Sequence, residues 1–315
     1  KPAVMYSLLD ALQALTGDYW ELRFIGKDKP HPAPTVRHLN LPKEVTGVIP
    51  FSDGLDSKAV HGLIENELGD GLVRVRLGTA NFAHEQGVDH RRPFASIPYK
   101  IKSAENRFPE PSARSRGFKF ATTSIIAAYL AKAPRIYVPE SGQGALGPAL
   151  TTVGQSHPDY RTHPFFLRKI ESYFEALLDW KPHFVFPRLW HTKAQTLTEY
   201  IALPNDAPDS WKSTRSCWQQ SGQASVNGHK RQCGVCAACM LRRLSIHGAG
   251  LEEPKETYVW ENLSVPSLDE GCAVGFDKSR ITQKMRDYAI AGTLHLQHLA
   301  DLRHSPADNK SLELE

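Results

Sequence analysis

The chain has 315 residues, of which 41% are hydrophobic and 23% charged, and its formal charge is +4 at pH 7. These values are typical of a globular protein with enough chain for one large core or two smaller ones. The mild positive charge permits polyanionic ligands but does not indicate a nucleic-acid binder. No apolar run has transmembrane length and no signal peptide is evident, so we predict a cytoplasmic protein without membrane contact.

The N-terminal region predicts a helix, a strand and a linker. Leucines recur at helical spacing over residues 5–15, and Thr16, Gly17 and Asp18 end the pattern. Residues 20–24 then alternate between apolar and polar types, as a strand does. Residues 26–44 contain four prolines, which indicates a linker.

The next stretch predicts a strand, a short polar loop and a helix. Residues 45–50 are apolar and partly β-branched, residues 51–57 form the loop, and apolar side chains recur at helical spacing from Ser57 to Leu68. Residues 72–77 read as a second strand. This βαβ order predicts an α/β fold with a parallel sheet flanked by helices. Ligands of such sheets bind where the strands end, which is where the loop lies.

The loop is suited to binding an anion. Free backbone N–H groups and the positive end of the helix dipole both face a ligand there. Ser52 and Ser57 can add hydroxyl donors, and Gly54 allows the backbone to approach a phosphate closely. The loop is too short for a Walker motif and lacks its Gly-Lys-Ser/Thr. The alternative is an ordinary polar turn between a strand and a helix.

Further along the chain, residues 84–95 predict a solvated loop and residues 96–101 a strand. Residues 112–132 predict a long helix, and Arg114 and Arg116 at its start can grip a phosphate or a carboxylate. Residues 136–138 predict another strand.

That strand leads into the glycine-rich residues 139–148, for which we predict no helix. Glu140 and Gln143 are polar groups there, either in a binding site at the end of the strand or in a flexible connection. An amphipathic helix running to Trp180 and a strand at residues 183–187 come next. Residues 191–193 then open one more helix, from which Lys193 can neutralise phosphate.

Four of the five cysteines cluster as Cys-x15-Cys-x2-Cys-x2-Cys, whereas Cys272 stands apart. Thiolates are soft ligands, and spacing by two residues lets neighbouring sulfur atoms converge on one ion. We predict a structural zinc site, with an iron–sulfur cluster as the main alternative. A disulfide framework is disfavoured in a cytosolic chain with an odd cysteine count. The predicted ligands are Cys217, Cys233, Cys236 and Cys239.

The loop resembles the pyrophosphate loop of the N-type ATP pyrophosphatases, usually written Ser-Gly-Gly-x-Asp-Ser, with Asp53 where the first of the paired glycines is usual. Together, the loop and the cysteines resemble the 7-cyano-7-deazaguanine synthase family over about residues 45–245. Supporting motifs are Arg-Ser-Arg-Gly at 114–117, Pro-Asp-Tyr-Arg at 158–161, Lys193 and Ser-Cys at 216–217. The resemblance implies an adenine nucleotide alpha hydrolase-like, Rossmann-like fold with a C-terminal zinc module built on four cysteines.

The resemblance also implies a chemistry. Family members use ATP and Mg²⁺ to adenylate the carboxylate of 7-carboxy-7-deazaguanine, and ammonia then displaces AMP on the way to the nitrile. By position, the resemblance implies catalytic roles for Asp56, Ser57 and Lys193, with Asp56 as the leading Mg²⁺ ligand and Asp53 a second candidate. The implied ATP-binding residues are Ser52, Asp53, Gly54, Leu55, Asp56, Ser57 and Arg116, and the implied substrate-binding residues are Glu140, Gln143 and Asp159.

Two further stretches, residues 15–20 and 139–143, are similar to the larger synthase-like proteins of bacterial antiviral defence. In that branch the resemblance implies that the acceptor amine is a partner protein's N-terminus, which would give an amide-linked deazaguanine. Three alternatives stay open: synthesis of the nitrile with ammonia, a nucleotide-binding scaffold that has lost activity at Asp53, and tRNA modification with sulfur transfer. The predicted division is an N-terminal extension (1–44), an ATP-pyrophosphatase domain (45–205), a zinc module (206–250) and a C-terminal extension (251–315).

Overall fold

The computed structural model describes residues 1–26, 42–52, 54–75, 115–154, 157–204, 209–219, 221–302 and 304. The chain divides into two compact units, and each is built from segments that are far apart in the sequence. The first unit contains Lys1–Ser52, Ile64–Pro139 and Asp159–Pro187. The second contains Asp53–Leu63, Glu140–Pro158 and Arg188–Glu315. The linear domain boundaries expected from the sequence stay a prediction.

A four-stranded parallel sheet forms the centre of the first unit, in the order β2-β1-β3-β4. Its strands are β1 (Gly47–Pro50), β2 (Leu72–Val75), β3 (Ile136–Tyr137) and β4 (Phe184–Val185). Val48 on β1 lies in register with Val73 on one side and Ile136 on the other. The predicted parallel pairing of the strands before and after the loop is confirmed.

The central strand β1 is apolar because both of its faces are covered. Val48 and Ile49 point to opposite faces and are both fully buried, which is the pattern of a parallel strand inside an α/β protein. Gly47 permits a close approach, since a Cβ atom there would lie 2.5 Å from Cε2 of Tyr137. The sheet therefore has a tightly packed centre.

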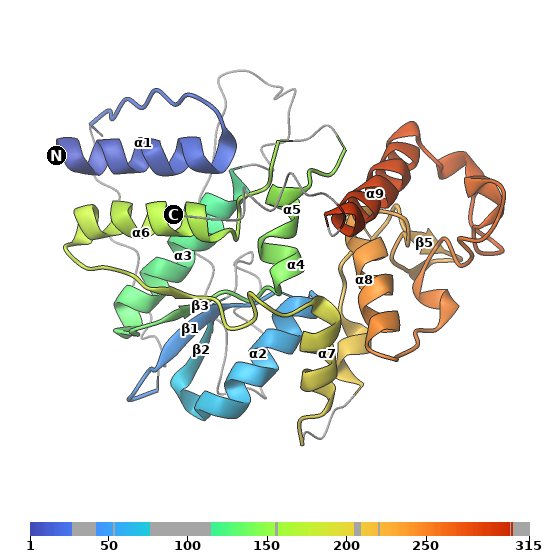
Figure 1. Ribbon diagram of the computed structural model, residues 1–315, viewed down its shortest axis with the longest axis horizontal. Coiled ribbons are helices and arrows are strands. Elements are labelled where there is room, and N and C mark those ends of the chain that lie inside the picture. The colour runs from blue at the N-terminus through green and yellow to red at the C-terminus, as the bar shows by residue number, and fades with distance from the viewer. Residues whose placement is uncertain are drawn as a thin grey trace. The chain divides into compact units, whose positions relative to one another are not determined.

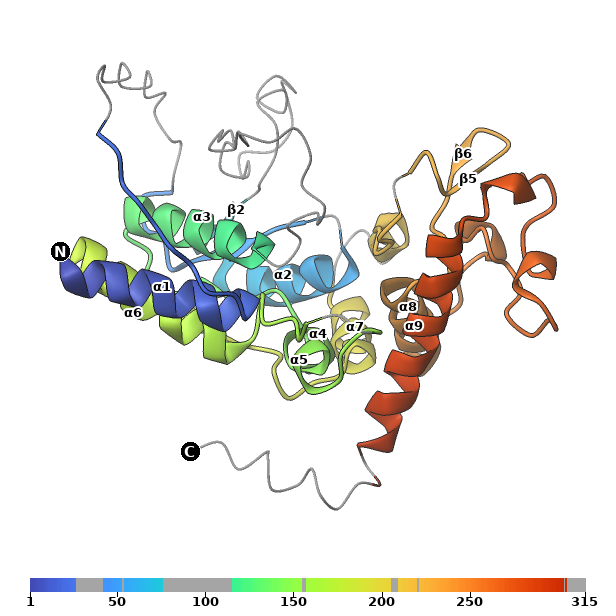
Figure 2. The ribbon, with the colours of Figure 1, turned by 90° about the horizontal axis from the view of Figure 1, so that it is seen from above.

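Helices α3 (Arg116–Ala131) and α6 (Pro164–Leu178) pack with this sheet, and α1 (Pro2–Thr16) packs on α6 and α3. Helices α1 and α6 lie side by side, and α3 lies against the strands (Figures 1 and 2). Gly17 ends α1 in the left-handed conformation, with φ of 72°, which favours glycine. The shared core includes Leu15, Ile125 and Phe166.

Residues 20–24 were expected to form a strand, and this prediction is wrong. Within the part of the chain that the structure describes, no strand pairs with them. Tyr19 and Phe24 are 95% and 76% exposed, while the Trp20 indole donates a hydrogen bond to Thr16 Oγ1. Alternation creates the two faces of a strand but supplies neither a neighbouring strand nor a core to cover one of them.

The second unit is mainly helical and includes a small antiparallel pair, β5 (Ser225–Val226) with β6 (His229–Lys230). Helix α2 (Leu55–Leu68) begins in this unit, two residues earlier than predicted. Helices α8 (Ala237–Gly248) and α9 (Gln283–Asp301) lie side by side (Figures 1 and 2). The other helices described in this unit are α4 (Gly142–Ala145), α5 (Gly147–Leu150) and α7 (Lys193–Ile201). Single 3₁₀ turns occur at Gly69–Gly71 in the first unit and at Ser210–Ser213, Lys255–Thr257, Leu268–Glu270 and Lys278–Arg280 in the second.

The glycine-rich residues 139–148 hold two short helices, α4 and α5, so the expectation of no helix there is wrong. The N–H of Gly142 donates to the carbonyl oxygens of both Arg188 and His191, and Pro148 stands in the first turn of α5. These bonds to a distant segment stabilise turns that glycine would not form by its own propensity.

Several sequence-based predictions fall outside the described residues. They concern the centre of the linker (27–41), Asp53, the end of the strand predicted at 72–77, the loop at 84–95, the strand at 96–101 and Arg114. Among the helices that are described, none combines the length and the apolar character needed to cross a membrane.

Candidate functional site

The start of α2 is anchored by its own side chains. Leu55 packs into an apolar cluster with Leu197 of α7, Trp211 and Ile246 of α8. The next two residues, Asp56 and Ser57, are also buried. Gly54 precedes them, and its carbonyl oxygen accepts the N–H of Lys58. The predicted phosphate-loop residues therefore lead into a helix whose first turn is held by the core of the second unit.

Asp56 forms a buried ion pair with Lys193, the first residue of α7. The side chains of Asp56 and Lys193 are only 8% and 14% exposed. Lys193 Nζ contacts Oδ2 of Asp56, and Ser141 Oγ donates to Oδ1 over 3.3 Å. Both carboxylate oxygens thus have partners within the same unit.

The helix dipoles stabilise the charge of one residue of this pair and destabilise the charge of the other. Asp56 lies in the first turn of α2, where the helix dipole stabilises an anion, but Lys193 lies in the first turn of α7, where a cation is disfavoured. Burial lowers the pKa of Lys193, yet the negative charges of Asp56 and Glu140 outweigh it and the net shift is upward. Lys193 is therefore a cation kept in place by carboxylates.

Residues at the start of α4 connect the two helices. Gln143 Oε1 accepts a hydrogen bond from the backbone N–H of Lys193 over 2.9 Å. The N–H of Gly142 donates to the carbonyl oxygens of Arg188 and His191, which lie just before α7. Thr192 and Gln195 complete a capping box on α7. Sequence reasoning singled out Gln143 but missed Ser141. The signal that was available is a serine in the short segment between a strand and a glycine-rich run.

Three predicted site residues lie in the first unit. Ser52 is exposed at the end of the segment after β1. Arg116 is exposed on the first turn of α3, with its guanidinium carbon 6.0 Å from the Phe120 ring. Asp159 pairs with Arg161, whose Nε donates to both carboxylate oxygens at 2.7–2.8 Å. The nucleotide-binding roles of Ser52 and Arg116 and the substrate-binding role of Asp159 stay predictions.

The four clustered cysteines converge, as their spacing predicts. The Sγ atoms of Cys217, Cys233, Cys236 and Cys239 all lie within 4.8 Å of one another. The Cys233 and Cys239 sulfur atoms are 3.8 Å apart. Four sulfur ligands placed ~2.3 Å from a tetrahedral zinc ion are about 3.8 Å from one another. The cluster can therefore hold a metal ion such as zinc after only a small contraction.

Local structure supports anionic sulfur at this cluster. Backbone N–H groups of Gln219 and Cys233 donate to Cys217 Sγ at 3.3 and 3.2 Å, and the N–H of Cys236 donates to Cys233 Sγ at 3.3 Å. Hydrogen bonds from the other three cysteine side chains lower the pKa of Cys217, whereas hydrogen bonds with neighbouring cysteines raise the pKa of Cys233 and Cys239, so anionic charge is favoured at Cys217 over those two. Cys272 contacts the carbonyl oxygen of Leu268 instead, and it lies outside the group of four.

Helix α8 ties the cysteine cluster to the rest of the second unit. Its first turn carries Cys239, and the side chain of Arg242 is fully buried in the same helix. Arg242 pairs with Glu253 at 2.6 Å and donates to Thr214 Oγ1 at 2.6 Å. A buried arginine with charged and neutral acceptors fixes the direction of the helix.

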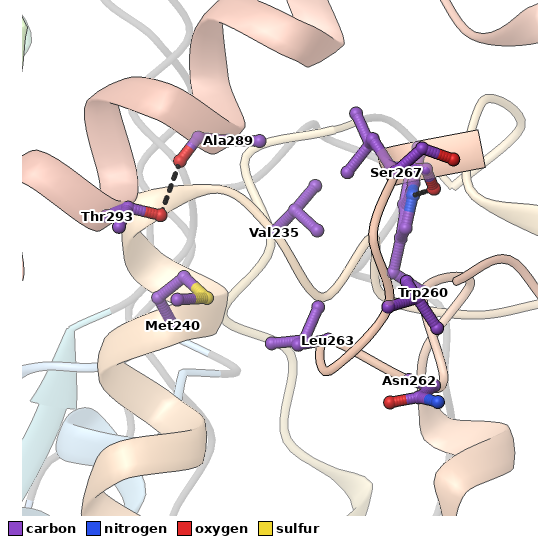
Figure 3. A pocket seen from close by; sticks show the side chains of 10 residues that line it. Val235, Met240, Trp260, Asn262, Leu263, Ser267, Ala289 and Thr293 are labelled. Atoms are coloured by element: carbon purple, nitrogen blue, oxygen red, sulfur yellow. Dashed lines mark hydrogen bonds between the residues drawn. The ribbon is translucent and has the colours of Figure 1, made fainter. Parts of the chain in front are cut away.

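A cavity of about 360 Å³ lies beside the cysteine cluster, between α8, α9 and residues 260–268 (Figure 3). The Trp260 indole donates to Leu268 O, Ser267 Oγ to Glu270 and Thr293 Oγ1 to Ala289 O. Because these polar groups are already paired, the cavity offers chiefly apolar surface. Its lining is Val235, Met240, Trp260, Asn262, Leu263, Val265, Ser267, Leu268, Ala289 and Thr293.

No protein-family model, curated protein or solved structure matches this chain.

Proposed function

We propose that the protein is an ATP-dependent ligase that forms AMP and pyrophosphate. It adenylates the carboxylate of 7-carboxy-7-deazaguanine and transfers the acyl group to an amine, the N-terminus of a partner protein in antiviral defence. The proposal includes an adenine nucleotide alpha hydrolase-like, Rossmann-like fold for the parallel sheet. It also includes a structural zinc ion at the four cysteines and a cytoplasmic location, because clustered thiols suit a reducing compartment.

One observation carries the proposal. Asp56 and Lys193 come from the first turns of two helices and meet in a buried pair, and Asp56 belongs to the loop that resembles a pyrophosphate loop. A buried ion pair adds little to stability compared with apolar packing, so a pair of this kind has to be explained by another role. Binding a nucleotide needs this combination: a carboxylate for a divalent cation and a cation for phosphate.

In the first step, a carboxylate oxygen of the substrate attacks the α-phosphorus of ATP, and the bond to the β-phosphate bridging oxygen breaks. Pyrophosphate leaves with that electron pair. Lys193 and the backbone N–H groups at the start of α2 bind the departing phosphates, and Ser57 adds a hydroxyl donor. Asp56 has the hard oxygen donors that Mg²⁺ prefers, and the ion would neutralise phosphate charge there. Lys193 has to turn from Asp56 to the phosphate for this to occur.

In the second step, the amine nitrogen attacks the carbonyl carbon of the acyl adenylate. The bond from this carbon to the phosphate oxygen breaks, AMP leaves, and the amine proton passes to solvent. Glu140 carries a negative charge that suits the N–H donors on the guanine-like edge of the substrate, and the Gln143 amide can add a contact there. Glu140 lies just before α4 and Gln143 lies in its first turn, and both are close to the Asp56–Lys193 pair.

Intact mass spectrometry of proteins encoded beside this chain, co-expressed with it, tests the proposal. The expected result is a partner whose mass rises by one deazaguanine acyl group at its N-terminus. Co-expression with Asp56→Asn should leave the partner unmodified. Free nitrile without any protein adduct would select the ammonia-dependent synthase instead. ATP binding without turnover of any deazapurine acid would select a scaffold that has lost activity.

A further inference from the structure

Ser141 occupies the N-cap position of α4 but does not cap the helix with its side chain. It stands at the position before α4, where a serine side chain normally accepts a backbone N–H of the first turn. Here the side chain makes no such cap bond. Its hydroxyl instead donates to Asp56 Oδ1 over 3.3 Å, across 85 residues of sequence. The backbone carbonyl of Ser141 still accepts the N–H groups of Gly144 and Ala145, both at 2.9 Å.

The backbone on the C-terminal side of Ser141 is held by hydrogen bonds to the segment that leads into α7. The residue is fully buried, and the next residue, Gly142, bonds the carbonyl oxygens of Arg188 and His191. Two residues further on, Gln143 accepts the first N–H of α7. The chain that carries Ser141 is therefore fixed to the start of α7, and Ser141 itself is fixed to the start of α2.

We propose that Ser141 is a positioning residue that sets the direction of the Asp56 carboxylate relative to Lys193. The role rests on the proposed function and extends it, because the resemblance assigns no part to this serine. A hydroxyl bonded to Oδ1 restrains rotation of the carboxylate and favours the orientation in which Oδ2 faces Lys193. When an anion takes Lys193, the same bond keeps Oδ2 directed at the incoming cation.

Amine labelling tests this role without any catalytic assay. The protein is treated with the N-hydroxysuccinimide ester of acetic acid, and acetylation of Lys193 is measured by mass spectrometry relative to Lys255, whose side chain is 70% exposed. In the wild-type chain Lys193 should react slowly. In Ser141→Ala, loss of one hydrogen bond to a charged group should raise the ratio about tenfold.

Thr151→Ala is the matched control, because Thr151 is also buried in the segment between Glu140 and Pro158, and its hydroxyl bonds His295 rather than Asp56. It should lower the thermal midpoint without changing the labelling ratio. Ser141→Cys keeps the shape with a weaker donor and should give an intermediate ratio. If Ser141→Ala and Ser141→Cys both label like the wild type, the positioning role is contradicted.

A second readout separates this inference from the proposed function. In ATP–pyrophosphate exchange with 7-carboxy-7-deazaguanine, Ser141→Ala should raise the Mg²⁺ concentration that gives half-maximal exchange, whereas Thr151→Ala should not. If the wild-type chain catalyses no exchange, the proposed function fails while the labelling result still decides the role of Ser141. If exchange occurs and the Mg²⁺ requirement of Ser141→Ala is unchanged, the positioning role fails alone.

Discussion

The carboxylate of Asp56 and the ammonium of Lys193 meet in a buried pair although they are 137 residues apart in the sequence. The pair joins the first turns of α2 and α7. Lys193 occupies a helix position where a positive charge is disfavoured, and it is kept there by Asp56 and by the Gln143 bond to its backbone. A residue placed at an electrostatic disadvantage is a sign of function more than of stability.

We predict that Lys193→Met destabilises the protein. The substitution leaves the Asp56 charge buried without its cation, which should lower the free energy of unfolding by about 3–5 kcal/mol. The double variant Asp56→Asn with Lys193→Met should recover most of that loss, because no unpaired charge remains. Urea unfolding of both variants measures the difference. Equal losses in the single and double variants would show that the pair contributes no mutual stabilisation.

We predict one zinc ion per chain, bound by the four cysteines. Cys233→Ser should lose the metal and lower the thermal midpoint, because a closed thiolate site contributes directly to folding. Cys272→Ser is the matched control and should keep one equivalent of zinc, since Cys272 lies outside the cluster. Metal content by plasma mass spectrometry checks both variants. Iron with acid-labile sulfide would support the iron–sulfur alternative instead.

Glu171 on α6 should make stability depend on pH. Burial raises the pKa of this carboxyl above 4.5, although it accepts the N–H of Phe184, which acts in the opposite direction. The folded protein then holds the proton more tightly than the unfolded chain, so the wild type gains stability relative to Glu171→Gln as pH falls through the folded pKa. This gain in stability should level off once the pH is below the ordinary pKa of a glutamate carboxyl.

Unfolding free energies between pH 4 and pH 8 test this dependence. Glu175→Gln on the same helix is the control, because its side chain is half exposed. A difference between the wild type and Glu171→Gln that stays constant across this range would contradict the predicted shift.

Gly142→Ala should disturb the link between α4 and α7. A Cβ atom at this position would overlap the carbonyl oxygen of Leu189, a backbone atom that has little room to move. We expect a loss of about 1–3 kcal/mol, typical of overpacking. Gly222→Ala is the control, because a Cβ there meets no atom within 4 Å. Thermal unfolding of the two variants compares them, and similar midpoints would argue against a tight contact.

The sequence predicted the features that depend on local pattern. Apolar runs and helical spacing indicated the βαβ order around residues 51–57, and the spacing of the cysteines indicated their convergence. These patterns work because a buried strand, an amphipathic helix and a metal knuckle each leave a periodic or fixed spacing in the chain.

Features that depend on distant partners could not be predicted in this way. The helix at Gly142 is held by carbonyl groups near residue 190, and the hydroxyl of Ser141 turns to Asp56 instead of capping that helix. Conversely, residues 20–24 alternate like a strand but have no pairing strand among the described residues. In each case tertiary contacts decided the outcome over local propensity.

The proposed ligase activity is tested most directly by product analysis with purified protein, ATP, Mg²⁺ and 7-carboxy-7-deazaguanine in the presence of an acceptor amine. We expect AMP and pyrophosphate in equal amounts, formed only when the deazapurine acid is present and lost in Asp56→Asn. Formation of ADP and phosphate, or AMP release that does not depend on the acid, would contradict the proposed activity.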